Sequence, residues 1–476
     1  MIDTEALRKK VIDLAIRGKL TEQLPEDGTA EELYAQIQEE KASLVKEKKI
    51  KKEKPLPAIE ADEIPFEIPK NWKWVRLSTI ITLQSGQDLA ASDYNSDNNG
   101  IPYITGASNF RADGTLIVNR WTTVPKSFAY KGDILLSCKG TVGKLTILEE
   151  KKVHLARQIM GIRVYIADRM FVSFFLECML ENLKNASKGL IPGIERNDIL
   201  SLVCPLPPYA EQKRIVDKID EVLSEIDIID AFQSQYHNNL EALKSKIIDA
   251  GIRGKLTEQL PTDGTAEELY AQIQEEKARL VKEGKIKKEK PLPAITEDEI
   301  PFEIPKNWKW VHFADIALHV STGPFGTMLH KADYCLDGIP LVNPSHMING
   351  KIVPANNKRV NAETLLRLSG YKLKENDLVL ARRGELGRCA VVTSKEDGWL
   401  CGTGSFFAHF GGGIIPQYIY SVFQTDTVRS RLMVSSVGAT MSNLNHSILK
   451  DLPVPLPPLA EQKRIVDKID EILRVI

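Results

Sequence analysis

The chain has 476 residues, 43% of them hydrophobic, and a formal net charge of −1. This length fits two or three domains with cores of their own, and the near-neutral charge argues against a protein that binds nucleic acid over its whole surface. No run of about eighteen apolar residues occurs, so we expect no membrane span. The six cysteines form no CxxC pair and the histidines no HxH or HExxH pattern, which predicts a cytoplasmic protein with reduced thiols, no metal site and no cofactor.

A long internal repeat organises the chain. Residues 17–74 recur as residues 253–310, and the two copies differ only at positions 26, 43, 48, 60 and 61 of the first copy. Most surface positions tolerate substitution. The identity therefore indicates a recent duplication, or two surfaces that bind the same partner, and these interpretations are compatible.

Each copy contains a predicted helix. Thr29 with Glu32, and Thr265 with Glu268, form a capping box at its start. The lysine run that follows, Lys46 to Lys54 in the first copy, is interpreted as a solvated helix end, with a phosphate or partner contact as the alternative. A proline-containing segment then leads to a Trp-x-Trp pair, which we expect to anchor the entry into the next domain.

Two unlike segments follow the repeats, and both are basic. Residues 71–204 hold 16 Lys and Arg against 12 Asp and Glu, and residues 307–453 hold 15 against 11. They share short apolar runs such as GDILLSCKGTVGK from Gly132 and NDLVLARRGELGR from Asn376, each ending in a Gly-x-x-Gly turn with basic neighbours. A small-residue loop and a strand running into PLPP close each segment. The sequence thus predicts one mixed α/β fold, used twice, with diverged loops in which specificity usually resides.

A predicted helix follows each variable segment. PLPPYAEQKRIVDKIDEVL from Pro205 returns as PLPPLAEQKRIVDKIDEIL from Pro455, and the middle copy continues to Ile252. We expect a helix from Pro208 to Ala250, about 60 Å long at about 1.5 Å per residue. Its apolar residues step by four and three, as on a coiled-coil face. This seam comprises Ile215, Ile219, Val222, Ile226, Ile229, Tyr236, Leu240, Leu243 and Ile247, with Ile465 and Ile469 on the last helix.

The partners of this seam are predicted to be the helices at the two chain ends, lying antiparallel to the middle helix. Central positions of the middle helix lack a counterpart in the end helices, so we expect the seam to be least covered there. The alternative is that each helix belongs only to the core of its own domain.

With these motifs the whole chain resembles the specificity (S) subunit of type I restriction-modification systems. The resemblance lies in PLPPYAEQKRIVDKID and its copy, in the paired IPKNWKW entries, and in the alternation of conserved and variable segments. It implies an α+β protein with two mixed α/β target-recognition domains in pseudo-twofold arrangement, separated by long antiparallel coiled-coil helices. It also implies a non-catalytic subunit in which each domain reads one half of a bipartite site in double-stranded DNA.

The resemblance divides the chain into five regions. These are an N-terminal conserved region (1–70), target-recognition domain 1 (71–204), a central conserved region with the spacer helix and repeat linker (205–306), target-recognition domain 2 (307–454) and a C-terminal conserved helix (455–476). The conserved regions would set the spacing of the half-sites and dock two methyltransferase (M) subunits. Restriction (R) translocase/nuclease subunits would join that complex.

Sequence readout needs side chains at base edges and phosphate contacts that fix the register. The candidate DNA-binding residues are Lys139, Lys144, Arg157 and Arg163 in the first domain and Arg382, Arg383 and Arg388 in the second. For each of them a surface or core-edge salt bridge is an open alternative. The candidate partner-binding residues are the acids of the repeats, Glu39, Glu40, Glu275 and Glu276.

Two other functions fit parts of the sequence. The run Asn343-Pro344-Ser345-His346 is similar to the NPP-aromatic motif of adenine-N6 DNA methyltransferases. The second proline and the aromatic residue are absent, however, and no strand-bound glycine-rich cofactor loop precedes the run. A coiled-coil scaffold that does not bind DNA would explain the helices, but it leaves the basic domains without a purpose.

Overall fold

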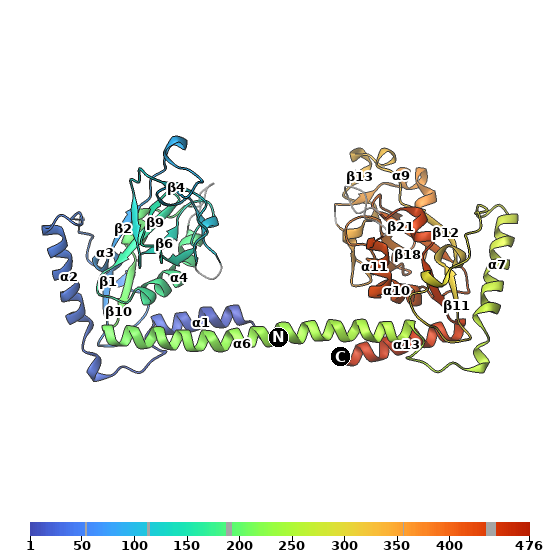
Figure 1. The fold of residues 1–476 in the computed structure, drawn as a ribbon, viewed down its shortest axis with the longest axis horizontal. Coiled ribbons are helices and arrows are strands. Elements are labelled where there is room, and N and C mark those ends of the chain that lie inside the picture. Colours follow the sequence, from blue (N-terminus) through green and yellow to red (C-terminus); the bar gives the residue numbers. More distant parts are fainter. Residues whose placement is uncertain (53–54, 112–114, 187–192, 356, 435–443) are drawn as a thin grey trace. The chain divides into compact units, whose positions relative to one another are not determined.

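The structure, a computed structural model, describes residues 1–476 except 53–54, 112–114, 187–192, 356 and 435–443. The chain forms two compact units, Met1–Ser234 and Gln235–Ile476 (Figure 1). Within the described part of the chain, no helix is both long enough and apolar enough to cross a membrane. The predicted small-residue loops fall largely on 187–192 and 435–443 and so lie outside the described residues.

The first unit contains a domain of two small sheets. One is antiparallel, with the order β2 (Ile81–Ser85), β9 (Ile159–Val164), β6 (Ile134–Ser137) and β7 (Leu145–Ile147). The other has the order β4 (Trp121–Thr122), β3 (Ile101–Ile104), β8 (Lys152–Leu155) and β5 (Phe128–Tyr130), with β3 and β8 parallel. A separate antiparallel pair is formed by β1 (Lys73–Arg76) and β10 (Val203–Leu206). The helices are α1 (Thr4–Ile16), α2 (Ala30–Lys46), α3 (Leu77–Ile80), α4 (Arg169–Ala186) and α5 (Arg196–Leu200).

The second unit repeats this plan. Its antiparallel sheet has the order β12 (Ala317–Thr322), β21 (Ser405–Phe410), β18 (Leu378–Ala381) and β19 (Cys389–Val391). Its other sheet has the order β13 (Tyr334–Cys335), β17 (Arg359–Val360), β14 (Ile339–Val342) and β20 (Leu400–Cys401), with β14 and β20 parallel. Two further pairs are β11 (Lys309–His312) with β22 (Pro453–Leu456), and β15 (Met347–Ile348) with β16 (Lys351–Ile352). The helices are α7 (Ala266–Lys282), α8 (Phe313–Ile316), α9 (Ala362–Arg367), α10 (Pro416–Gln424), α11 (Asp426–Val434), α12 (His446–Lys450) and α13 (Leu459–Val475).

The central strands β6 and β18 are buried along their whole length. In β6, Ile134 and Leu136 join the core shared with the helices, whereas Leu135 joins a second core under the other sheet. Because successive side chains point to opposite faces of a sheet, a strand buried on both faces must be apolar throughout. This explains the continuous apolar runs before the Gly-x-x-Gly turns, and it confirms the predicted mixed fold used twice.

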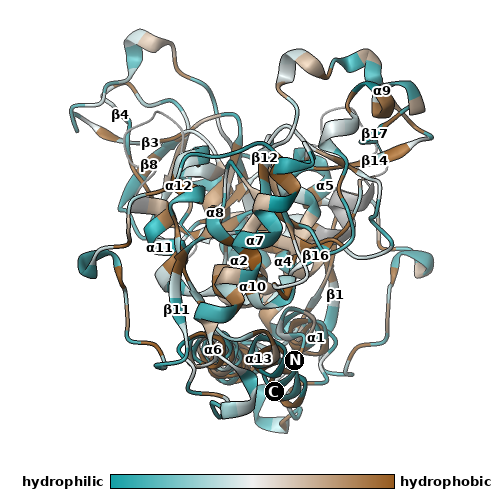
Figure 2. Cartoon of the chain, turned by 90° about the vertical axis from the view of Figure 1, so that its right-hand side faces the viewer, coloured by the Kyte–Doolittle hydropathy of each residue, from teal (hydrophilic) through white to brown (hydrophobic). Residues whose placement is uncertain are grey.

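The longest helix is α6 (Tyr209–Ile252), with 44 residues. In the first unit α1 lies antiparallel to it, with ion pairs from Arg8 to Asp227 at 2.6 Å and to Asp230 at 2.8 Å. In the second unit α13 runs antiparallel to it (Figure 1) and packs Ile469 against Gly251, where a Cβ atom would come within 2.9 Å of that side chain. Figure 2 shows hydrophobic and hydrophilic residues sharing the surfaces of α6 and α13, as amphipathic pairing requires.

The predicted seam of α6 is covered at its two ends. Ile215, Ile219 and Ile226 are buried in the first unit, and Ile465 and Ile469 of α13 are buried in the second. In contrast, Tyr236 is 63% exposed and Leu243 is 44% exposed. The remaining seam residues of α6 are half-buried, namely Val222, Ile229, Leu240 and Ile247. The apolar seam is thus exposed in the middle of the helix. The helix begins at Tyr209, so Pro208 precedes it and does not form its first residue as predicted.

The motif AEQKR joins each repeat to its domain. Glu211 is fully buried, and its Oε2 accepts a hydrogen bond from Trp72 Nε1 at 2.9 Å. The neighbouring Gln212 accepts a hydrogen bond from the backbone N–H of Asp168, which precedes α4, at 2.6 Å, and Arg214 forms an ion pair with Asp27. The equivalent contacts in the second unit are Glu461 with Trp308, Gln462 with the N–H of Ile415, and Arg464 with Asp263. This explains why the motif closes both variable segments. Trp72 and Trp308 are confirmed as buried anchors, whereas Trp74 and Trp310, which were expected in the core as well, are half-buried.

Candidate nucleic-acid interface

Four loops of the first unit meet at one end of its strands. We name residues 85–89, 104–109, 138–144 and 155–158 the first loop cluster. Backbone hydrogen bonds connect them: Cys138 N–H donates to Gln158 O at 2.8 Å, Ala156 N–H to Ile104 O at 2.9 Å, and Gln87 N–H to Leu155 O at 2.8 Å. Gly86 permits this closeness, because a Cβ atom there would lie 1.9 Å from the carbonyl oxygen of Ala156.

The second unit has an equivalent group of loops. We name residues 322–326, 342–346, 381–388 and 402–405 the second loop cluster. Arg382 N–H donates to Gly404 O at 2.9 Å, and Gly402 N–H donates to Val342 O at 2.8 Å. Gly323 is equivalent to Gly86, because a Cβ atom at this position would lie 1.8 Å from the carbonyl oxygen of Gly402. One backbone frame therefore presents two different sets of side chains.

The structure brings three of the four predicted basic residues of the first domain into its loop cluster. Lys139 and Lys144 are exposed on the Gly-x-x-Gly turn, where Gly140 and Gly143 have positive φ. Arg157 is exposed and pairs with Asp88 of the neighbouring loop at 2.8 Å. An exposed pair of this kind contributes about 0–1 kcal/mol, so a DNA phosphate or base edge can replace the carboxylate at small cost.

The structure places Arg163 elsewhere. It lies towards the far end of β9, where its Nε and Nη2 donate to the two carboxylate oxygens of Asp133 at 2.8 and 2.7 Å. The guanidinium also lies over the ring of Tyr130. The Asp133 carboxylate raises the pKa of Arg163. These contacts give Arg163 an internal role at the end of the sheet.

The three predicted arginines of the second domain all lie in the second loop cluster. Arg383 is exposed and makes no ion pair with any described residue. Arg388 pairs with Glu385 in the same turn. Arg382 is half-buried, with its guanidinium 6.0 Å from the centre of the Phe406 ring and a buried Nε for which the described residues supply no acceptor. Arg383 is thus the side chain best placed to reach a partner.

Two neighbouring features bear on the enzyme alternative. Burial raises the pKa of the Cys389 thiol to about 12, so this thiol beside Arg388 stays protonated and unreactive near neutral pH. The Asn343–His346 turn closes on itself through the His346 N–H, which donates to Asn343 O at 2.9 Å. The imidazole of His346 is buried, with its Nδ1 2.8 Å from Leu341 O. Neither feature offers an exposed catalytic group.

The predicted partner-binding acids lie on α2 and α7. Glu39, Glu40 and Glu275 are exposed, whereas Glu276 is half-buried. The carboxylate of Glu276 faces Gly411, where a Cβ atom would lie 2.3 Å from it. Three of the four acids are therefore open to a partner.

Gln87 and Gln158 were not predicted as site residues. Both amides are exposed in the first loop cluster, beside Asp88 and Arg157, respectively. Amide side chains pair with adenine in the major groove. Gln158 could have been found from the Arg-Gln pair between two predicted strands, but the position of Gln87 depends on loop contacts that a sequence does not show.

The comparison with known families bears directly on these two domains. The family described as "Type I restriction modification DNA specificity domain" matches residues 69–235 and again residues 305–476. The chain belongs to this family. Both matches of the specificity domain begin within the repeat, near Pro69 and Pro305, and extend through one variable segment into the following helix.

Alignments with known relatives extend over almost the whole of this specificity-domain protein. It is 27% identical to the type I restriction enzyme EcoEI specificity subunit of Escherichia coli, over 98% of this chain and 89% of that protein. It is 29% identical to the EcoAI specificity subunit of Escherichia coli, over 98% and 88%. In fold it is similar to a chain from a solved structure described as "Structural basis underlying complex assembly and conformational transition of the type I R-M system", with a TM-score of 0.58, 17% identity and coverage of 86% and 92%.

Proposed function

We propose that this chain is the DNA specificity subunit of a cytoplasmic type I restriction-modification complex, in which each loop cluster reads one half of a bipartite site in double-stranded DNA. The observation that carries the proposal is one backbone frame, built twice, with different side chains on equivalent loops. Membership of the specificity-domain family supports the same conclusion. The chain supplies recognition, and the associated subunits supply the chemistry.

Within each half-site the exposed cations have two roles. Lys139 and Lys144 neutralise phosphates and fix the register, because lysine is a compact point charge. Arg157 and Arg383 reach base edges, since a guanidinium can donate two hydrogen bonds to guanine. The exposed amide of Gln158 suits adenine in the first half-site.

The conserved regions bind the other subunits. Each repeat docks one methyltransferase (M) subunit, with Glu39, Glu40 and Glu275 on the exposed side of the repeat helix. Restriction (R) subunits join this assembly, and the conserved helices set the spacing of the two half-sites. Two nearly identical repeats favour two copies of one partner over two different partners.

Exchange of residues 71–204 for the corresponding segment of another family member tests this function. The methylated DNA motif of cells that carry the chimera and its methyltransferase is then mapped. We expect one half-site to change and the other to persist. A change in both half-sites would contradict independent reading, and an assembled complex that does not discriminate between DNA sequences would favour the scaffold alternative.

A further inference from the structure

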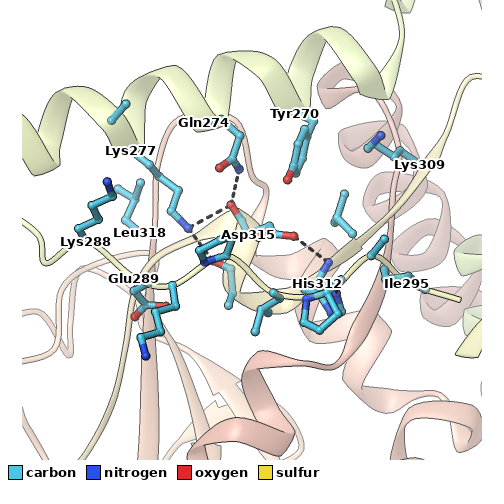
Figure 3. Close-up of a pocket in the computed structure, with 18 of the residues that line it drawn as sticks. Tyr270, Gln274, Lys277, Lys288, Glu289, Ile295, Lys309, His312, Asp315 and Leu318 are labelled. Carbon is cyan, nitrogen blue, oxygen red and sulfur yellow. Dashed lines mark hydrogen bonds between the residues drawn. The ribbon is translucent and has the colours of Figure 1, made fainter.

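A groove of about 730 Å³ lies in the second unit between α7, the proline-containing segment and β11 (Figure 3). Its lining includes the apolar side chains of Leu292, Ile295 and Trp310. One wall is fixed by Lys277, whose Nζ donates to the carbonyl oxygens of Ala314 at 2.6 Å and Asp315 at 3.2 Å. Burial lowers the pKa of Lys277. A groove with one fixed wall and a lining that combines apolar and charged side chains fits a protein segment.

The charge around this groove is mainly positive. Lys287, Lys288 and Lys290 line it and are exposed, and none of them pairs with an acid in the part of the chain that the structure describes. The acid among them, Glu289, is neutralised by Lys450. An occupant is therefore expected to be acidic.

The groove also contains a donor without an acceptor. Trp310 Nε1 is buried and has no hydrogen-bond partner among the described residues. Buried donors are nearly always paired in folded proteins. A carboxylate or carbonyl oxygen of an occupant would supply the missing acceptor.

The repeat preserves most of this lining, and only its last part, from His312 to Leu318, differs from the first unit. Every lining residue from Tyr270 to Val311 has an identical residue at the equivalent position between Tyr34 and Val75, and none of the five differing positions lines the groove. In the first unit Lys41 anchors the equivalent wall, donating to Ser78 O at 2.6 Å. Folding does not require identity of exposed lysines, so their identity fits a shared partner as well as a recent duplication.

We propose that this groove receives an acidic, partly apolar segment of the methyltransferase subunit, and that its equivalent in the first repeat receives the same segment of a second copy. The proposal rests on the proposed function. A DNA backbone is the other polyanion that lysines attract. The apolar side chains in the lining favour a protein segment over a DNA backbone.

The test uses the full chain titrated with the methyltransferase subunit of its own complex, with native mass spectrometry for stoichiometry. Lys287→Glu with Lys288→Glu alters the second groove, and Lys51→Glu with Lys52→Glu alters the first. Lys282→Glu with Lys285→Glu is the matched control, because it reverses two charges of the same lysine run outside the lining. We expect each groove variant to weaken one of the two binding events by about tenfold or more, the combined variant to weaken both, and the control to bind as the wild type does.

Two results would overturn the groove proposal. One is unchanged binding of two methyltransferase subunits by the combined variant, or equal weakening by the control. The other is unchanged methyltransferase binding with reduced retention of the complex on duplex DNA, which would assign the lysines to phosphates. Failure of the wild-type chain to bind any methyltransferase would instead refute the proposed function itself.

Discussion

The substitution Glu211→Gln tests the contact that joins α6 to the first repeat. The Glu211 carboxylate is fully buried and accepts hydrogen bonds from Trp72 Nε1 at 2.9 Å, Asn71 Nδ2 at 3.2 Å and Gln23 Nε2 at 3.0 Å. Glutamine keeps the size of the side chain but replaces one acceptor oxygen by an NH₂ group, so at least one donor then faces another donor. The substitution removes a charged acceptor and leaves a buried donor unpaired, while the other hydrogen bonds remain. We therefore expect the free energy of unfolding of the first unit to fall by about 2–4 kcal/mol.

Hydrogen exchange read by mass spectrometry measures this loss, with peptides from residues 1–234 and 235–476 reporting the two units separately. Glu461→Gln is the matched control, because Glu461 accepts from Trp308 Nε1 at the same 2.9 Å. It should reduce protection in the second unit only. The reasoning would be refuted by a change below about 0.5 kcal/mol, the usual range of surface substitutions, or by equal losses in both units after either substitution.

Three further predictions concern the helices and the readers. Lys48 follows the end of α2 with φ +58°, where the second repeat has Gly284 at φ +71°. Glycine adopts this left-handed conformation more easily than lysine, so Lys48→Gly should stabilise the first unit by up to about 1 kcal/mol and Gly284→Lys should destabilise the second. Denaturant titration measures both changes. Arg157→Ala should weaken the discrimination between correct and incorrect bases at one half-site by about 1–3 kcal/mol, and Arg383→Ala should do so at the other. Binding to DNA targets with single base changes measures this. Weaker discrimination at both half-sites after either substitution would contradict the prediction. Seven residues inserted after Ser234 keep the apolar seam in phase and lengthen α6 by about 10 Å. The spacer between the two half-sites should then lengthen by about one to three base pairs. Unchanged spacing in methylation mapping of an active variant would show that α6 does not set the spacer length.

Local patterns in the sequence predicted the elements well. The capping boxes at Thr29 and Thr265 form as expected, and the apolar runs from Gly132 and Asn376 contain the central strands β6 and β18. These features depend on neighbouring residues, which a sequence displays directly. The exposure of Tyr236 agrees with the expectation that the seam is least covered at the centre of the helix. The exposure of Leu243 was harder to predict, since a seam shows that a helix needs a partner but does not show how closely that partner covers it.

Contacts between distant residues could not be predicted. Glu211 and Trp72 are 139 positions apart, and nothing near either residue marks them as partners. Likewise, Arg163 and Arg157 look equivalent in the sequence, but only the fold shows that Asp133 holds the former. The loop clusters depend on the close approach of Gly86 and Gly323 to opposing carbonyl groups, which emerges only when four loops are assembled.

The central claim is that each domain reads its own half-site independently. The most direct measurement replaces residues 307–454 by a second copy of residues 71–204. The joints lie in the repeat and just before the PLPP segment that leads into the AEQKR motif, whose contacts are the same in both units. The methylation motif of the resulting complex is then mapped. We predict the first half-site on both sides of the spacer. Retention of the original two different half-sites, or a motif containing neither, would contradict the claim.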